Sequence, residues 1–90
     1  MLTYLPHELG ECVKLKKLSL NHNRITGVQN ILENMQELDE LNLSQNKIEF
    51  ISGLPESLTI LNLSGNKIAS FPETIKKCKL VYCNLKDNNI

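Results

Sequence analysis

Leucines recur along this chain in a fixed pattern of apolar and polar positions. Four eleven-residue segments, which begin at residues 15, 38, 58 and 80, each read L-x-x-L-x-L-x-x-N-x-I. Five positions are specified in each segment, and the only departure is Cys83, which stands where a leucine is expected. The segments start 23, 20 and 22 residues apart. Self-similarity at this period predicts a stack of similar structural units.

The Leu-x-Leu part of each segment predicts a short β-strand, because successive side chains of a strand point to opposite faces. The leucines then share one face and the residues between them share the other. A strand this short hides its leucines only against its neighbours, so we expect the four strands to lie abreast in a parallel sheet. Parallel neighbours need a long connection, and the 9 to 12 residues between segments provide it.

The connections between the segments differ in length and pattern. Residues 26–37 carry apolar side chains at helical spacing, which predicts a helix of two to three turns, and those side chains are Val28, Ile31, Leu32 and Met35. Thr26 and Gln29 also stand at capping-box spacing. Residues 49–57 are too few for such a helix and predict an extended or turn-like return. Residues 71–79 predict a single helical turn.

Each segment carries one asparagine where the chain leaves the predicted strand, and these are Asn23, Asn46, Asn66 and Asn88. The chain turns there, so backbone groups lose their sheet partners. An asparagine amide both donates and accepts hydrogen bonds, and leaving such groups buried and unsatisfied costs about 1–3 kcal/mol each. We therefore expect a stacked ladder of structural asparagines.

These segments resemble the leucine-rich repeat family, and the resemblance covers nearly all of the chain. Residues 1–14 resemble the convex half of one further repeat, so a partial repeat would precede the strand segments that start at 15, 38, 58 and 80. The resemblance implies one α/β domain over residues 1–90. It also implies a right-handed β-α superhelix, a curved solenoid with a short parallel sheet on its concave face. Helical turns and extended returns would form the convex face.

Composition narrows the partners and the compartment. Ten basic and ten acidic residues cancel, so the chain has no general reason to bind nucleic acid or an anionic membrane. No stretch approaches the ~18 consecutive apolar residues of a membrane span, and the first eight residues lack the basic and apolar regions of a signal peptide. The three cysteines are an odd number without ligand spacing. We read them as reduced thiols of an intracellular, cytoplasmic protein, with Cys83 buried as a small hydrophobe.

The outward residues of the strands are the usual binding surface of the family, so the resemblance makes them the candidates for partner binding. They are Lys17, Glu40, Asn42, Ile60, Asn62, Tyr82 and Asn84. The third and fourth strands also expose Ile60, Val81 and Tyr82, and exposed branched and aromatic side chains are typical anchors for a protein partner.

The same residues also fit a solvated scaffold. Lys16 and Lys17 can neutralise Asp39 and Glu40 on the next strand, which lies ~4.8 Å away, and Ile60 can pack against its cross-strand neighbour. The asparagine row at positions 42, 62 and 84 is the commonest filling of this repeat. It creates two apparent glycosylation signals, Asn42-Leu43-Ser44 and Asn62-Leu63-Ser64, which we attribute to the repeat itself.

No pattern indicates catalysis, a metal site or a cofactor. The chain lacks a Gly-rich phosphate loop and a recognisable nucleophile–base set, and His7 and His22 have no ligand-like neighbours. We expect a non-enzymatic module that binds another protein through its concave face. The alternative is a structural spacer or self-associating segment of a larger protein, for example the recognition arm of a signalling protein or ligase. Neither end shows the polar cap of a solenoid. For the alternative function we therefore expect that copies can associate end to end.

Overall fold

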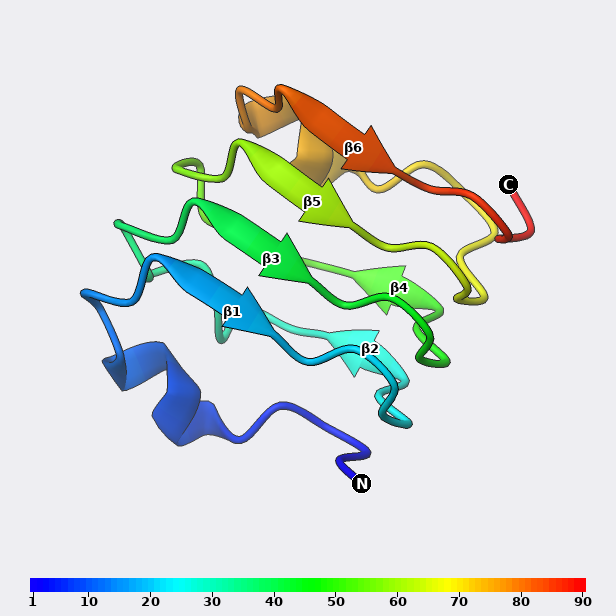
Figure 1. The fold of residues 1–90 in the computed structure, drawn as a ribbon, viewed down its shortest axis with the longest axis horizontal. Helices are drawn as coiled ribbons and strands as arrows, with labels where there is room; N and C mark the ends of the chain where they lie inside the picture. Colours follow the sequence, from blue (N-terminus) through cyan, green and yellow to red (C-terminus); the bar gives the residue numbers. More distant parts are fainter.

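A computed structural model describes residues 1–90, and it consists of two parallel sheets with short connections between them (Figure 1). The larger sheet has the order β1-β3-β5-β6. Its strands are β1 (Lys17–Ser19), β3 (Glu40–Asn42), β5 (Ile60–Asn62) and β6 (Tyr82–Asn84). The smaller sheet pairs β2 (Gly27–Val28) with β4 (Phe50–Ile51). Two 3-10 helices complete the fold, η1 (His7–Glu11) and η2 (Glu73–Lys77).

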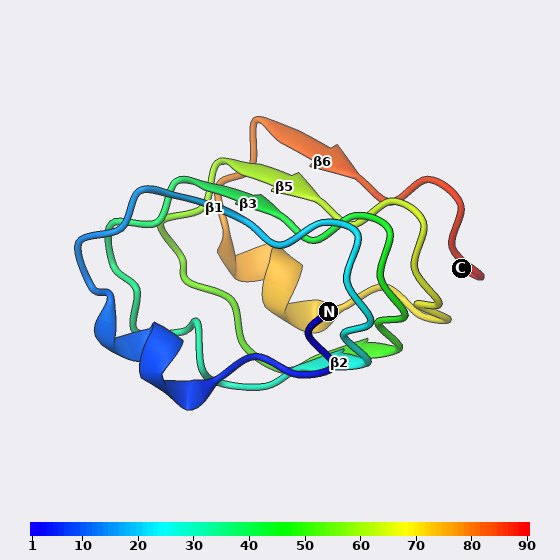
Figure 2. The ribbon, with the colours of Figure 1, turned by 60° about the horizontal axis from the view of Figure 1, so that its bottom comes forward.

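The predicted parallel arrangement of the four strand segments is confirmed. Leu18 pairs with Leu41, Leu41 with Leu61, and Leu61 with Cys83, each in a parallel ladder. Figure 2 shows the strands stacked along one side of the molecule with the connections returning on the other side. The 20- to 23-residue repeat therefore equals one turn of the stack.

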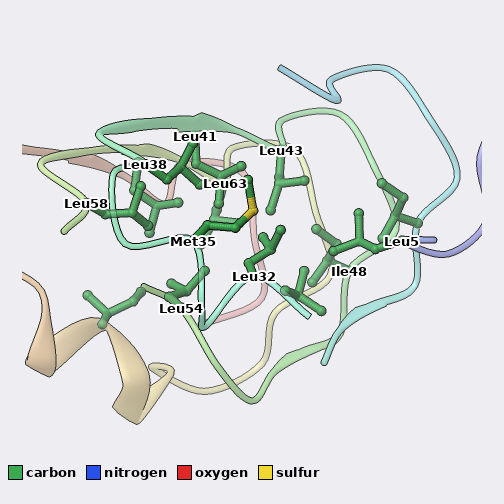
Figure 3. Close-up of a cluster of buried hydrophobic side chains, with 14 of the residues drawn as sticks. Leu5, Leu32, Met35, Leu38, Leu41, Leu43, Ile48, Leu54, Leu58 and Leu63 are labelled. Atoms are coloured by element: carbon green, nitrogen blue, oxygen red, sulfur yellow. The ribbon is translucent and has the colours of Figure 1, made fainter. Parts of the chain in front are cut away.

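The leucine rows form a single core between the strands and the connections. Fifteen hydrophobic residues are buried in it, and twelve large side chains are less than 2% exposed. Figure 3 shows Leu32 and Met35, from the connection that follows β2, beneath the leucines of the larger sheet. The core lies between the two sheets because each strand is too short to cover its own leucines.

The helix predicted over residues 26–37 is wrong. Gly27 and Val28 form β2 and pair with Phe50 and Ile51, and the residues that follow form successive turns. Parallel pairing with the next connection satisfies backbone groups that a helix would have satisfied internally. The apolar spacing still serves burial, because Val28, Leu32 and Met35 are all fully buried.

The other two connections have the expected form. Residues 49–57 contain β4 and a turn, without a helix, and residues 71–79 contain the single short helix η2. At the start of the chain, the Leu2 N–H donates to Asn23 Oδ1 (2.9 Å) and the Arg24 N–H donates to the Leu2 carbonyl (2.7 Å). Residues 1–14 thus lie where the connection of a preceding repeat would lie.

The expectation of a buried Cys83 is also wrong, because the residue is exposed, although partial burial still raises the pKa of its thiol. β6 is the last strand of the sheet and has a neighbour on one side only. The preceding inward residue of the same column, Leu61, lies between two strands and has no exposed surface. The position in the stack therefore decides burial more than the residue type does.

Candidate interaction surface on the strands

All seven candidate binding residues lie on one surface, which we call the strand face. In β1, β3 and β5 the middle residue is more buried than the first and third. Side-chain alternation and the register place the residues of β6 in the same rows. The registers bring the first residues together in one row, which runs Lys17, Glu40, Ile60, Tyr82. The third residues form a second row, which runs Ser19, Asn42, Asn62, Asn84.

A hollow of about 430 Å³ lies on the strand face. Six of the seven candidates line it, and Asn84 lies outside the lining. The remaining lining residues are Leu18, Ser19 and Leu41. The side chains of all four strands of the larger sheet thus converge on one depression.

The charges at one end of the strand face largely cancel. Lys17 Nζ lies 3.8 Å from Glu40 Oε1, and the side chain of Lys17 is 74% exposed and that of Glu40 37% exposed. A solvated pair of this kind contributes little to stability. The second expected pair does not form, because Lys16 has no ion-pair partner and Asp39 accepts a hydrogen bond from the Thr59 hydroxyl. The hollow therefore has little net charge.

The other end of the strand face is apolar. Ile60 pairs with Tyr82 across β5 and β6, and Tyr82 remains 50% exposed. Val81, which comes just before β6, is 85% exposed. This end has no strand beyond it to cover its side chains.

In the asparagine row of the strand face, only the oxygen of each side-chain amide makes hydrogen bonds within the protein. Asn42 Oδ1 accepts from the Ser44 N–H (3.0 Å) and hydroxyl (2.7 Å), and Asn62 Oδ1 does the same with Ser64 (3.0 and 2.8 Å). Asn84 Oδ1 accepts from the Lys86 N–H. These contacts hold the turn after each strand. The three Nδ2 groups make no hydrogen bond within the protein, so they remain available to a partner.

The second set of asparagines has a different place and role. Asn46 Nδ2 donates to the carbonyls of Leu20 (3.1 Å), Leu43 (3.0 Å) and Ser44 (3.2 Å), while its Oδ1 accepts from the Ile25 N–H (3.1 Å). Asn66 repeats this pattern one unit later, and both side chains are 7% exposed. Each asparagine thus ties its own turn to the preceding repeat, away from the strand face.

A left-handed backbone column, absent from the sequence-based reasoning, shapes the same turns. The residues before the ladder asparagines have φ between 56° and 68°, and they are His22, Gln45, Gly65 and Asp87. Glycine adopts this conformation without a steric penalty, whereas other residues rarely do. Of these four residues, only Gly65 has a residue type that indicates a left-handed backbone from the sequence.

The largest hollow, about 470 Å³, lies on the opposite side, beside the short connection over residues 49–57. Its lining has a single hydrophobic residue and includes Glu33, Glu56 and Glu73. Burial raises the pKa of the neighbouring Cys78 thiol, and Glu56 and Cys83 raise it further by smaller amounts. Without an apolar anchor this notch is less suited to a protein partner than the strand face is. No three His, Cys, Asp or Glu residues lie close enough together to hold a metal ion.

The comparison with protein families agrees with the repeat and the register. Residues 13–68 match the family model described as leucine rich repeat. The chain belongs to the leucine-rich repeat family. Such domains generally mediate protein–protein interaction.

Several curated leucine-rich repeat proteins are similar to this domain over most of its length. The mouse leucine-rich repeat and calponin homology domain-containing protein 1 is 39% identical over 87% of the chain. The rat leucine-rich repeat-containing G-protein coupled receptor 5 is 41% identical over 82%. The human leucine-rich repeats and immunoglobulin-like domains protein 3 is 34% identical over 99%. The chain spans only 8% to 11% of the length of these relatives.

The relatives support the fold of this domain and say less about its location in or outside the cell. One of them is named as a receptor, so kinship does not favour the cytoplasmic location that we expected from the sequence. No helix of this domain has the length and hydropathy that crossing a membrane requires.

Proposed function

We propose that this leucine-rich repeat domain is a non-enzymatic module that binds another protein through its strand face. The observation that carries the proposal is the hollow of about 430 Å³, in which six of the seven candidate residues meet. A shallow depression with an aromatic rim is a common site for the anchor residues of a protein interface. In the curved superhelix typical of the family, this face would be the concave one.

The chemistry of the hollow favours a partner of low charge. Lys17 and Glu40 neutralise each other at one end, while Ile60 and Tyr82 offer apolar area at the other. The free Nδ2 groups of the asparagine row suit carbonyl or hydroxyl acceptors. We therefore expect a partner that inserts an apolar side chain beside Tyr82 and presents hydrogen-bond acceptors along the row.

Replacing Ile60 and Tyr82 together by serine tests this site. We expect the double variant to lose the proteins that the wild-type domain captures in a quantitative pull-down, with binding weakened by about tenfold or more, as for the loss of an interface anchor. Tyr4→Ser is the matched control, because Tyr4 is also exposed, at 70%, but lies beside the smaller sheet, away from the strand face. Equal retention of partners by both variants would place the site elsewhere.

The salt dependence of binding tests the low charge of the site. Solvated charges interact over roughly 8–10 Å at physiological ionic strength, so a partner held by surface charges would dissociate as salt rises. We expect the affinity of the captured partner to change by less than about threefold between low and high salt. A steep loss of affinity would show that the exposed lysines, and not the hollow, carry the interaction.

A structural spacer, or a self-associating segment of a larger protein, is the second candidate function. The observation that favours it is the in-register parallel pairing of successive repeats, because each unit of such a stack pairs with the next. In a larger protein the domain would then serve as a recognition or assembly arm of a signalling protein or ligase. A pull-down with all seven candidate residues replaced separates the two functions, because only the first function loses its partners.

We place the domain inside the cell, without nucleic acid, membrane or cofactor as a partner. The support is the balanced charge and the three free thiols, Cys12, Cys78 and Cys83. Fractionation of cells that express the native full-length protein, combined with a glycosidase treatment, tests the location. A glycan at Asn42 or Asn62 would contradict it.

A further inference from the structure

Three consecutive repeats carry a cation at the same position, directly after the ladder asparagine. These residues are Arg24, Lys47 and Lys67, and we call them the basic row. All three are exposed. They belong to the turns that follow β1, β3 and β5, and Figure 1 shows these turns stacked along one edge of the molecule.

The backbone holds the basic row in register. The Lys47 N–H donates to the Ile25 carbonyl at 2.9 Å. The Lys67 N–H donates to the Ile48 carbonyl, also at 2.9 Å. The N–H groups of the same two isoleucines donate to ladder asparagines of the next repeat, at 3.1 and 2.9 Å. Neighbouring members of the row therefore stand about 4.8 Å apart at the backbone. Their positions are fixed without a partner, which lowers the entropic cost of binding one.

No acidic side chain neutralises the basic row. None of its members takes part in an ion pair, because the three ion pairs of the chain lie elsewhere. Glu49, two residues after Lys47, is the acidic residue nearest to the row in the sequence, and it makes no ion pair either. On the strand face, by contrast, the register sets Lys17 against Glu40. The balanced charge of the whole chain thus coexists with a positive edge.

We propose that the basic row binds a short acidic segment of a protein partner in an extended conformation. Side chains two residues apart in an extended segment share a face and stand about 6.7 Å apart, and the row spans roughly 10 Å over its three members. Two carboxylates on one face of the segment therefore meet all three cations. Arg24 adds a planar group that can hold a carboxylate through two parallel N–H donors.

The surroundings of the basic row favour a short segment over a long polyanion. Glu49 follows the row by two residues, and Asp87 lies in the turn after β6, at the same edge. Their carboxylates repel a continuous run of negative charge, such as a nucleic acid or an anionic membrane presents. A protein segment with few, spaced carboxylates avoids this repulsion. The inference concerns a second surface and does not depend on the proposed use of the strand face.

Fluorescence anisotropy with a labelled peptide tests the basic row. The probe is an octapeptide of alternating glutamate and serine, and its matched control carries glutamine in place of each glutamate. We expect the protein to bind the glutamate peptide about tenfold more tightly than the glutamine peptide. That affinity should fall by about fivefold or more between about 20 and 150 mM salt, because exposed charges are screened. The low-charge partner expected at the strand face does not show this salt dependence.

Two double variants locate the bound peptide. Lys47→Gln with Lys67→Gln removes two cations of the row, and we expect about tenfold weaker binding, since one exposed ion pair contributes roughly two- to fivefold. The control, Lys14→Gln with Lys79→Gln, removes two exposed lysines that precede strands, at the opposite edge of the larger sheet. Both variants lower the net charge equally, so only the position of the charge differs. The control should change the affinity by less than about twofold.

The outcomes separate this inference from the proposed function. Tighter binding of the glutamate peptide, lost in the row variant and kept in the control variant, supports it. Absent or equal binding of the two peptides overturns it, and so do equal effects of the two double variants. A single-stranded oligonucleotide or phosphatidylserine vesicles that bind at the row, where the glutamate peptide does not, also overturn it. The Ile60→Ser, Tyr82→Ser variant should bind the peptide as the wild type does, and a loss there would place the peptide in the hollow and overturn the assignment to the row.

Discussion

Asn66, like Asn46, links four backbone groups in the centre of the stack. Its Nδ2 donates to the carbonyls of Leu43 (3.0 Å), Leu63 (2.9 Å) and Ser64 (3.3 Å). Its Oδ1 accepts from the N–H of Ile48 (2.9 Å), a residue with no exposed surface. Asn66→Ala removes all four contacts at once.

The cost of this substitution can be worked out from what each partner retains. The Leu43 carbonyl keeps Asn46, the Leu63 carbonyl keeps Asn88, and the Ser64 carbonyl keeps the Gln45 N–H. Only the Ile48 N–H loses its single acceptor.

A buried, unsatisfied N–H costs about 1–3 kcal/mol, and each shared bond lost adds about 0.5 kcal/mol. We therefore expect the free energy of unfolding to fall by about 3 kcal/mol, a large part of the ~5–15 kcal/mol of a typical domain.

Urea unfolding measures this loss, with Asn62→Ala as the control. At a slope of about 1.5 kcal/mol per molar urea, the midpoint of Asn66→Ala falls by about 2 M. Asn62 is half-buried on the strand face, and its Oδ1 accepts only from Ser64. Water can replace those contacts, so Asn62→Ala costs less than about 1 kcal/mol.

The comparison of these two asparagines decides whether the ladder stabilises the fold. If Asn66→Ala and Asn62→Ala lower the free energy of unfolding by amounts within about 0.5 kcal/mol of each other, burial and connectivity of the amide do not matter, and the reasoning is refuted.

Four further substitutions probe the turn, the core and a thiol. Gly65→Ala, at φ 68°, should lower the free energy of unfolding by about 1 kcal/mol. Gln45→Gly, at φ 56°, should leave the free energy of unfolding equal or higher. Urea unfolding that shows a loss of stability for both variants would contradict this. Leu61→Ala should cost about 2–5 kcal/mol in the same assay, because Leu61 is fully buried. Glu56→Gln should lower the raised pKa of Cys78 and so speed its alkylation near pH 8, followed by mass spectrometry; an unchanged rate would remove Glu56 as a cause.

The strands and their register were predictable because the pattern has only one solution. Leucines at alternate positions must share a face, and a parallel stack hides them all at once. Leu18, Leu41 and Leu61 accordingly stand abreast. The repeat also revealed the asparagine column, although not the number of carbonyls that each amide reaches.

The connection over residues 26–37 could not be predicted from its own sequence. Its apolar spacing fits a helix, but the same spacing buries Val28, Leu32 and Met35 from a run of turns. Pairing with Phe50 and Ile51 decides between them, and that partner lies more than twenty residues away. Local periodicity reports which side chains are buried and does not report which backbone satisfies its hydrogen bonds.

The sequence by itself determined the repeat, the parallel sheet and the residues that face outward, because side-chain alternation and the need to hide leucines leave no other arrangement. Only the tertiary structure decided how exposed each repeat is. Leu61 and Cys83 occupy the same position in the pattern, yet one is fully buried and the other is exposed. The reason is that burial in a stack comes from the neighbouring strand, and β6 has a neighbour on one side only.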